Sequence, residues 1–131
     1  MIWRNCTILA LSAIVLTSAS GAKRLPEDQE IARAIQGKVA DPAADCVNTQ
    51  GSHPRLFSYG TNLLYRISND TVYVVRTSGG CEGVSRGDSL QTRPFKARLC
   101  VGDIAYTTQI PSNLPSGSCT IKRVTRYQSR G

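Results

Sequence analysis

The chain has 131 residues and a net charge of +7, from 16 basic and nine acidic side chains. Five cysteines and a single histidine, His53, leave few groups for metal or covalent chemistry. The sequence has no Cys-x-x-Cys pair, no P-loop and no glycine-rich dinucleotide fingerprint, which argues against a zinc ribbon, a nucleotide hydrolase and a dinucleotide-binding enzyme.

Residues 1–22 have the three parts of a secretory signal peptide. Arg4 supplies a positive charge, an apolar run covers residues 7–16, and small residues continue to Ala22. The apolar run is shorter than the roughly 20 residues that cross a bilayer as a helix, which argues against a membrane anchor. We therefore predict cleavage after Ala22, with Ala19 as an alternative site. The protein is expected to be exported to the periplasm or the cell exterior, with no transmembrane segment after cleavage.

Four cysteines remain in the predicted mature chain: Cys46, Cys81, Cys100 and Cys119. An even number of cysteines in a short exported chain predicts two disulfides, because the compartment is oxidising and a small core gains from covalent links. Three pairings exist for four cysteines. We favour the nested pairing, Cys46 with Cys119 and Cys81 with Cys100, because it joins the ends of the domain and closes its middle.

Residues 23–45 are predicted to form a short helix and a linker. Pro26 suits a first helical position, and acidic residues follow it at the positive end of the helix dipole. Ile31, Ala34 and Ile35 share one helical face, and Gly37 is predicted to end the helix. Residues 39–45 contain a proline and no periodicity, which indicates a linker.

Residues 46–124 are predicted to form an antiparallel β domain. The clearest signal is a hairpin in which residues 62–68 and 71–77 flank Asn69-Asp70, two residue types that suit a tight turn. Pairing Ser68 with Thr71 gives the hairpin one strongly apolar face. In this register Leu63, Tyr65 and Ile67 share that face with Val72 and Val74.

Further strands are expected to begin at Cys46 and Arg55 and to cover residues 89–92, 95–100, 103–110 and 118–124. Lys122-Arg123 interrupts the alternation of the last strand and predicts a bulge, and residues 125–131 are expected to form a frayed basic tail. No helical pattern separates the strands. The predicted fold is mainly β: a small antiparallel sheet or partly closed barrel of five to six strands with two disulfides, preceded by the signal peptide and one short helix.

Several segments carry a resemblance to known sequences. They are residues 29–37 (QEIARAIQG), 45–47 (DCV), 64–66 (LYR), 71–73 (TVY), 98–103 (RLCVGD) and 117–119 (GSC). Their most distinctive part is Leu99-Cys100-x-Gly102-Asp103. With these segments, most of the predicted mature chain resembles a group of short exported bacterial proteins of unknown function. The resemblance implies an exported domain of this architecture and supplies no catalytic residues.

The positive charge is concentrated in the predicted β domain and tail. From Cys46 onward there are eleven basic and four acidic residues, whereas residues 23–45 have a net charge of −1. Arginine binds phosphate and carboxylate groups through two parallel hydrogen bonds, so a polyanion is the expected ligand. The predicted binding residues are Arg66, Lys96, Arg98, Lys122, Arg123 and Arg126. The preferred partner is an anionic envelope component, lipopolysaccharide or anionic lipid, with nucleic acid less favoured and no cofactor or metal.

Two other classes of function stay open. A small secreted hydrolase of the ribonuclease type could use His53 with Glu82 or Asp103, and a structural module could bind a protein that the sequence does not identify. Asp103 follows a predicted turn, where its carboxylate is expected to accept backbone hydrogen bonds. The sequence therefore favours a non-catalytic binding module, with no catalytic residue assigned.

Overall fold

The computed structural model describes residues 27–92 and 98–130. The predicted signal peptide, the start of the predicted helix and Lys96 lie outside the described residues. Within the described ranges, no helix has both the length and the apolar character needed to cross a membrane.

The mainly β, antiparallel fold with one helix and two disulfides is confirmed. The described part of the chain forms more strands than predicted. In chain order the elements are α1 (Glu27–Ile35), β1 (Lys38–Asp41), β2 (Cys46–Asn48), β3 (Arg55–Tyr59), β4 (Asn62–Arg66), β5 (Thr71–Thr77), the 3-10 helix η1 (Glu82–Arg86), β6 (Ser89–Thr92), β7 (Arg98–Cys100), β8 (Ile104–Thr108) and β9 (Pro115–Ser129).

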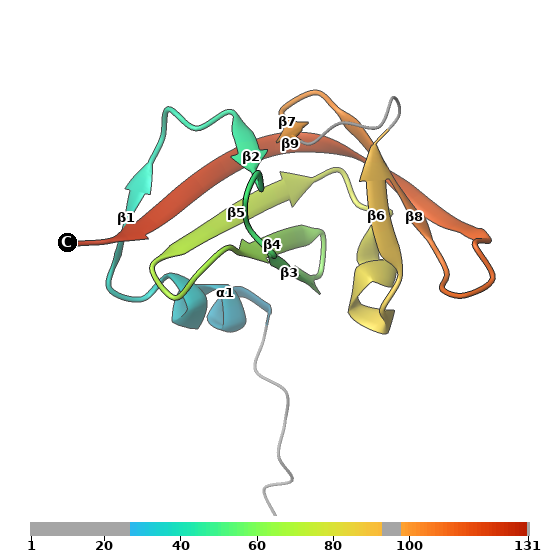
Figure 1. The fold of residues 1–131 in the computed structure, drawn as a ribbon, viewed down its shortest axis with the longest axis horizontal. Coiled ribbons are helices and arrows are strands. Elements are labelled where there is room, and N and C mark those ends of the chain that lie inside the picture. The colour runs from blue at the N-terminus through green and yellow to red at the C-terminus, as the bar shows by residue number, and fades with distance from the viewer. Residues whose placement is uncertain (1–26, 93–97, 131) are drawn as a thin grey trace, which may run out of the picture.

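The long strand β9 runs across the whole molecule and joins the other strands (Figure 1). Its first part pairs with β8, and its last part pairs with β5 on one edge and β1 on the other. The strand order is β3-β4-β5-β9-β8-β6, with β1 beside the end of β9, and every pair is antiparallel. The sheet is open, so the antiparallel-sheet form of the prediction holds and a closed barrel does not form.

The predicted bulge at Lys122-Arg123 is confirmed. Arg76 lies opposite Arg123 and Thr77 lies opposite Ile121, so β9 has one more residue than β5 at this point. A bulge of one residue moves the following side chains to the other face of the strand. Cys119 and Ile121 are therefore buried before it, and Val124 is buried after it.

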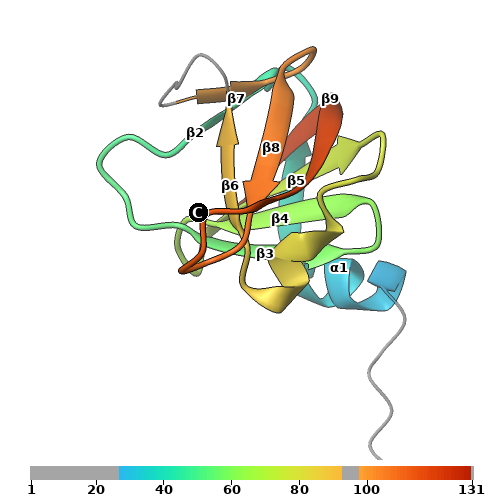
Figure 2. The ribbon, with the colours of Figure 1, turned by 90° about the vertical axis from the view of Figure 1, so that its right-hand side faces the viewer.

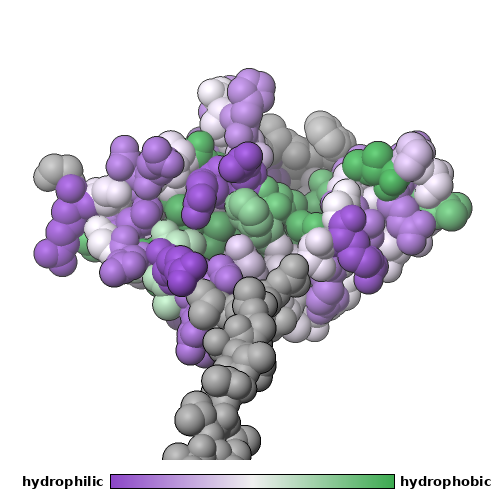
Figure 3. Space-filling view, turned by 90° about the horizontal axis from the view of Figure 1, so that it is seen from below, coloured by the Kyte–Doolittle hydropathy of each residue, from purple (hydrophilic) through white to green (hydrophobic). Residues whose placement is uncertain are grey.

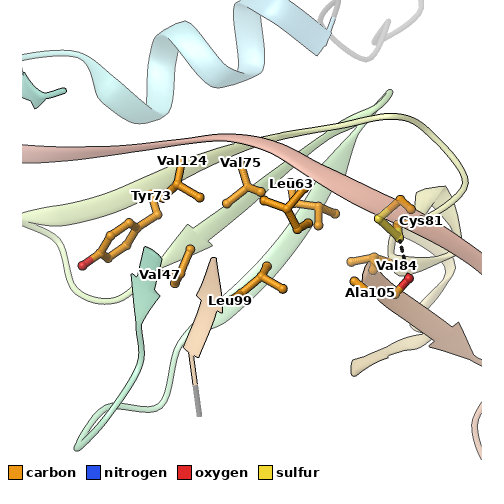
Figure 4. Close-up of a cluster of buried hydrophobic side chains, with 11 residues drawn as sticks. Val47, Leu63, Tyr73, Val75, Cys81, Val84, Leu99, Ala105 and Val124 are labelled. Carbon is orange, nitrogen blue, oxygen red and sulfur yellow. Dashed lines mark hydrogen bonds between the residues drawn. A yellow bond between two sulfur atoms is a disulfide. The ribbon is translucent and has the colours of Figure 1, made fainter. Parts of the chain in front are cut away.

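Both faces of the sheet bury apolar side chains. The face covered by the two-stranded sheet β2–β7 holds the larger cluster, which includes Val47, Leu63, Val75 and Leu99 (Figure 4). Tyr65 packs against this cluster, and burial raises the pKa of its hydroxyl, which therefore stays protonated at neutral pH.

The opposite face holds a smaller cluster of Leu64, Val72 and Val74. Helix α1 covers it, and Figures 1 and 2 show α1 on one side of the strands with β2 and β7 on the other. The predicted apolar face of the helix is confirmed, because Ile31, Ala34 and Ile35 pack on this cluster. Gly37 follows the helix with a positive φ of 73°, as expected for a residue that ends a helix.

The predicted register of the β4–β5 hairpin is wrong by one residue. Leu63 lies opposite Val75 and Tyr65 opposite Tyr73. The Ser68 hydroxyl accepts hydrogen bonds from the backbone amides of Asp70 and Thr71, and this draws Ser68 into the turn. The apolar pattern could not select the register, because β5 is buried on both faces.

Two segments predicted to be irregular are strands. Residues 38–41, which were expected to lie in the linker, form β1, and residues 125–129, expected to be a frayed tail, form the end of β9. The two segments pair with each other, and Ser129 also donates a backbone hydrogen bond to Asp70. Neither segment has an apolar pattern of its own in the sequence. Each is ordered by a strand partner that is distant in the sequence, so local pattern could not predict it.

The two-disulfide prediction is confirmed, but the nested pairing is wrong. Cys46 is bonded to Cys100 and Cys81 to Cys119. Cys46 and Cys100 lie directly opposite each other on β2 and β7, with their Cα atoms 4.0 Å apart. The other bond joins the segment after β5 to β9 inside the larger cluster. Strand pairing across the fold decides these neighbours, and sequence spacing does not report it.

Mild reduction of the folded protein is expected to release Cys46 and Cys100 before Cys81 and Cys119. Thiol–disulfide exchange needs access to the sulfur atoms. Cys46 and Cys100 are half-buried, whereas Cys81 and Cys119 are only 2% and 3% exposed. Alkylation during reduction, followed by peptide mass spectrometry, measures the order. Earlier labelling of Cys81 and Cys119, or a peptide joining Cys46 to Cys119, would contradict the structure.

Gly117→Ala is expected to lower the free energy of unfolding by about 2 kcal/mol, within the usual range for overpacking. A Cβ atom on Gly117 would overlap the carbonyl oxygen of Gly80, which is part of the backbone and cannot rotate away. Urea denaturation measures the loss. The exposed neighbour Ser118→Ala is the control and should change stability by less than about 0.5 kcal/mol. Equal effects of the two substitutions would show that this close approach is absent.

Candidate anion-binding site

The predicted cationic residues do not gather on one surface. Arg66 and Arg123 lie on the helix side of the sheet, since Arg66 is 5.9 Å from the ring of Phe57 in the smaller cluster and Arg123 lines a groove beside α1. Arg126 lies opposite Tyr73, on the other side. The remaining described members are also apart: Arg98 is exposed on β7 and Lys122 is the bulge residue.

Arg126 is engaged within the protein. Its Nη2 atom lies 2.7 Å from Oδ2 of Asp41, and the two residues are cross-strand partners on β9 and β1. This ion pair neutralises Arg126 and links the two segments that form the end of the sheet. Arg126 therefore has a structural role, in which it holds β1 to the end of β9.

Arg76 and Arg123 form the strongest candidate site, and we call them the arginine pair. They lie directly opposite each other on β5 and β9, and both are exposed. Like charges in this position destabilise a sheet. Among residues 28–92 and 98–130, no carboxylate forms an ion pair with either guanidinium. The arrangement brings together two arginine forks that can bind one anion from two sides.

The arginine pair continues as a polar row across three strands. Asn62 on β4 lies opposite Arg76, so the order across the sheet is Asn62, Arg76 and Arg123. The Asn62 amide adds a neutral hydrogen-bond donor beside the two cations. The predicted set omitted Arg76 and Asn62. The correct hairpin register together with the bulge at residue 122 would have placed both beside Arg123.

A groove of about 290 Å³ lies between α1 and this polar row. Its apolar lining includes Ile31, Ile35, Val74 and Tyr127, and Asp28 is the acidic residue among the described side chains that line it. Figure 3 views the molecule from the helix side, where hydrophobic surface at the centre is surrounded by hydrophilic residues. The groove thus combines a cationic row with an apolar lining.

The residues considered for hydrolysis lie in three different segments: the β2–β3 loop, η1 and the turn between β7 and β8. His53 is exposed in the loop between β2 and β3. Glu82 accepts a hydrogen bond of 2.8 Å from the Gly80 amide, and Asp103 accepts one of 2.8 Å from the Cys100 amide, as predicted for Asp103. Both carboxylates hold turns. In the part of the chain that the structure describes, no group of three or more His, Cys, Asp or Glu side chains is arranged to hold a metal ion.

A second polar cluster supports the fold where η1 meets β8 and β9. The Ser116 hydroxyl donates to Oδ2 of Asp88 at 2.6 Å and lies 2.8 Å from the Thr107 hydroxyl, whose side chain is buried. Arg86 lies 3.7 Å from the same carboxylate oxygen. These mutual hydrogen bonds satisfy the buried polar groups, which is a structural role.

Comparisons with known proteins give no match. No protein-family model fits the sequence, and neither the curated proteins nor the solved structures include one that is significantly similar. The resemblance to short exported bacterial proteins stays a prediction.

Arg123→Gln is expected to leave the free energy of unfolding unchanged or to raise it by a few tenths of a kcal/mol at low salt, because it removes repulsion from Arg76. Arg126→Gln is the matched control and should lower stability by up to about 1 kcal/mol, because it breaks the pair with Asp41. Urea denaturation at two salt concentrations measures both. A larger loss for Arg123→Gln would mean that Arg123 serves the fold.

Proposed function

We propose that this protein is a non-catalytic binding module that recognises an anionic component of the cell envelope through Arg76 and Arg123. The observation that carries the proposal is the arginine pair itself. Two exposed guanidinium groups face each other on neighbouring strands without a carboxylate partner in the described residues. An arrangement that costs the fold stability is explained when an anion from outside relieves the repulsion.

The chemistry of the row suits phosphate or carboxylate. Each guanidinium can donate two parallel hydrogen bonds to such a group, and the Asn62 amide can donate another. The groove wall of α1 removes part of the surrounding water, which strengthens charge interactions relative to an open surface. The protein's contribution is binding and orientation, and no bond of the ligand is broken.

The cell envelope is the proposed location because of two features. The first 22 residues have the layout of a signal peptide, and two disulfides are typical of proteins in oxidising compartments. Lipopolysaccharide and anionic lipid present phosphate groups there. Nucleic acid is less favoured, since the predicted cations are divided between both sides of the sheet and do not follow one groove as a nucleic-acid backbone requires.

The oxidised protein, after cleavage of the predicted signal peptide, is expected to bind lipopolysaccharide or anionic phospholipid vesicles and to bind zwitterionic vesicles and single-stranded DNA more weakly. The double variant R76Q/R123Q should lose at least tenfold in affinity, and the dependence of binding on salt should fall, because fewer counterions are released. Vesicle co-sedimentation and calorimetry across a salt titration measure this.

The matched control for this experiment is R98Q/R130Q, which also removes two exposed arginines but lies outside the site. It should retain most of the affinity. Equal losses in the two double variants would mean that net charge alone drives binding. Absence of binding to every anionic surface at physiological salt would reject the proposed function.

A further inference from the structure

We infer that the groove beside α1 binds a hydrocarbon chain together with the anion, so that the ligand is an amphiphile with one anionic headgroup. The inference rests on the proposed function at the arginine pair and specifies the ligand class. It is carried by the position of the apolar lining relative to the polar row.

The apolar lining begins directly beside the arginine pair. Val74 is two residues from Arg76 on β5, and Tyr127 is four residues from Arg123 on β9. At about 3.4 Å per residue, the groove therefore extends on the order of 13 Å from the cationic row toward Tyr127. A ligand whose head lies on the arginines can lay its body along these side chains.

The groove exists because α1 does not cover the whole face. The helix packs over β3 and β5, and the groove opens between the helix and β9. Ile31 and Ile35 are only partly buried, so each presents apolar surface both to the sheet and to the groove. Apolar surface left open next to a cationic row is where a bound chain would replace water.

The size and charge of the groove select a small ligand with one head. Its volume is about 290 Å³, and a water molecule in the liquid takes about 30 Å³, so it holds on the order of ten atoms of that size. Asp28 lies among the lining residues with Arg76 and Arg123, so these three charges sum to +1. A single phosphate or carboxylate head fits this balance.

The test compares soluble probes that differ only in head or chain: inorganic phosphate, butyl phosphate, octyl phosphate and octanol, each below its aggregation concentration. Calorimetry or NMR titration of the oxidised protein, after cleavage of the predicted signal peptide, measures affinity. Full burial of one methylene is worth about 0.8 kcal/mol, which is a fourfold change in affinity. Because the groove is open to solvent, we expect a change in affinity of about twofold for each methylene. Octyl phosphate should thus bind at least tenfold more tightly than butyl phosphate, and octanol should bind weakly.

Variants separate the head site from the chain site. R76Q/R123Q should reduce the affinity for octyl phosphate to the affinity for octanol. Ala32→Phe fills the groove from an exposed helix position. It should lower the affinity for octyl phosphate and leave the affinity for inorganic phosphate unchanged. Gln29→Phe is the matched control, because Gln29 is exposed on the same helix and is not among the groove-lining residues.

The outcomes distinguish this inference from the proposed function. Binding of inorganic phosphate through the arginine pair, with no gain from the alkyl chain, would overturn the inference and leave the proposed function standing. The inference would also be overturned if Ala32→Phe and Gln29→Phe reduced the gain in affinity from the alkyl chain equally. The alkyl chain would then bind outside the groove. Failure of all phosphates and of anionic vesicles to bind would reject the proposed function itself.

Discussion

The structure depends on the pairing of β9 with three strands. β8 pairs with its first part, and β5 and β1 pair with opposite edges of its last part. Because side chains alternate along a strand, a continuous 15-residue strand would turn its apolar residues away from the larger cluster beyond Ile121. The bulge at Lys122 restores the alternation, so that Val124 is also buried. The same strand can therefore serve both halves of the sheet.

The bulge also creates the candidate site. Without the extra residue, Arg123 would lie on the same side as Cys119 and Ile121, facing the larger cluster. With it, Arg123 lies on the helix side and directly opposite Arg76. One local irregularity thus supports the core on one face of the sheet and places two cations together on the other.

The two faces of the sheet differ in how strongly they are covered. The larger cluster contains the buried Cys81–Cys119 disulfide and lies under the β2–β7 sheet, which the Cys46–Cys100 disulfide closes. The other face is covered by the nine-residue helix α1 alone among the described elements, and partly exposed apolar side chains remain beside it. The disulfide-linked face is therefore the more fully buried one, and the helix side keeps partly exposed apolar surface.

Local sequence patterns were enough to predict the strands with a clear alternation, the apolar face of α1, the bulge at Lys122 and the presence of two disulfides. The disulfide pairing, the β4–β5 register and the surroundings of Arg76 and Arg126 became visible in the folded chain alone. Arg76 has no carboxylate partner in the described residues, whereas Arg126 is held by Asp41. The difference lies in the distance along the chain over which each interaction acts. Alternation and turn chemistry act between near neighbours, whereas β1, the end of β9 and the arginine pair are defined by contacts between segments far apart in the chain.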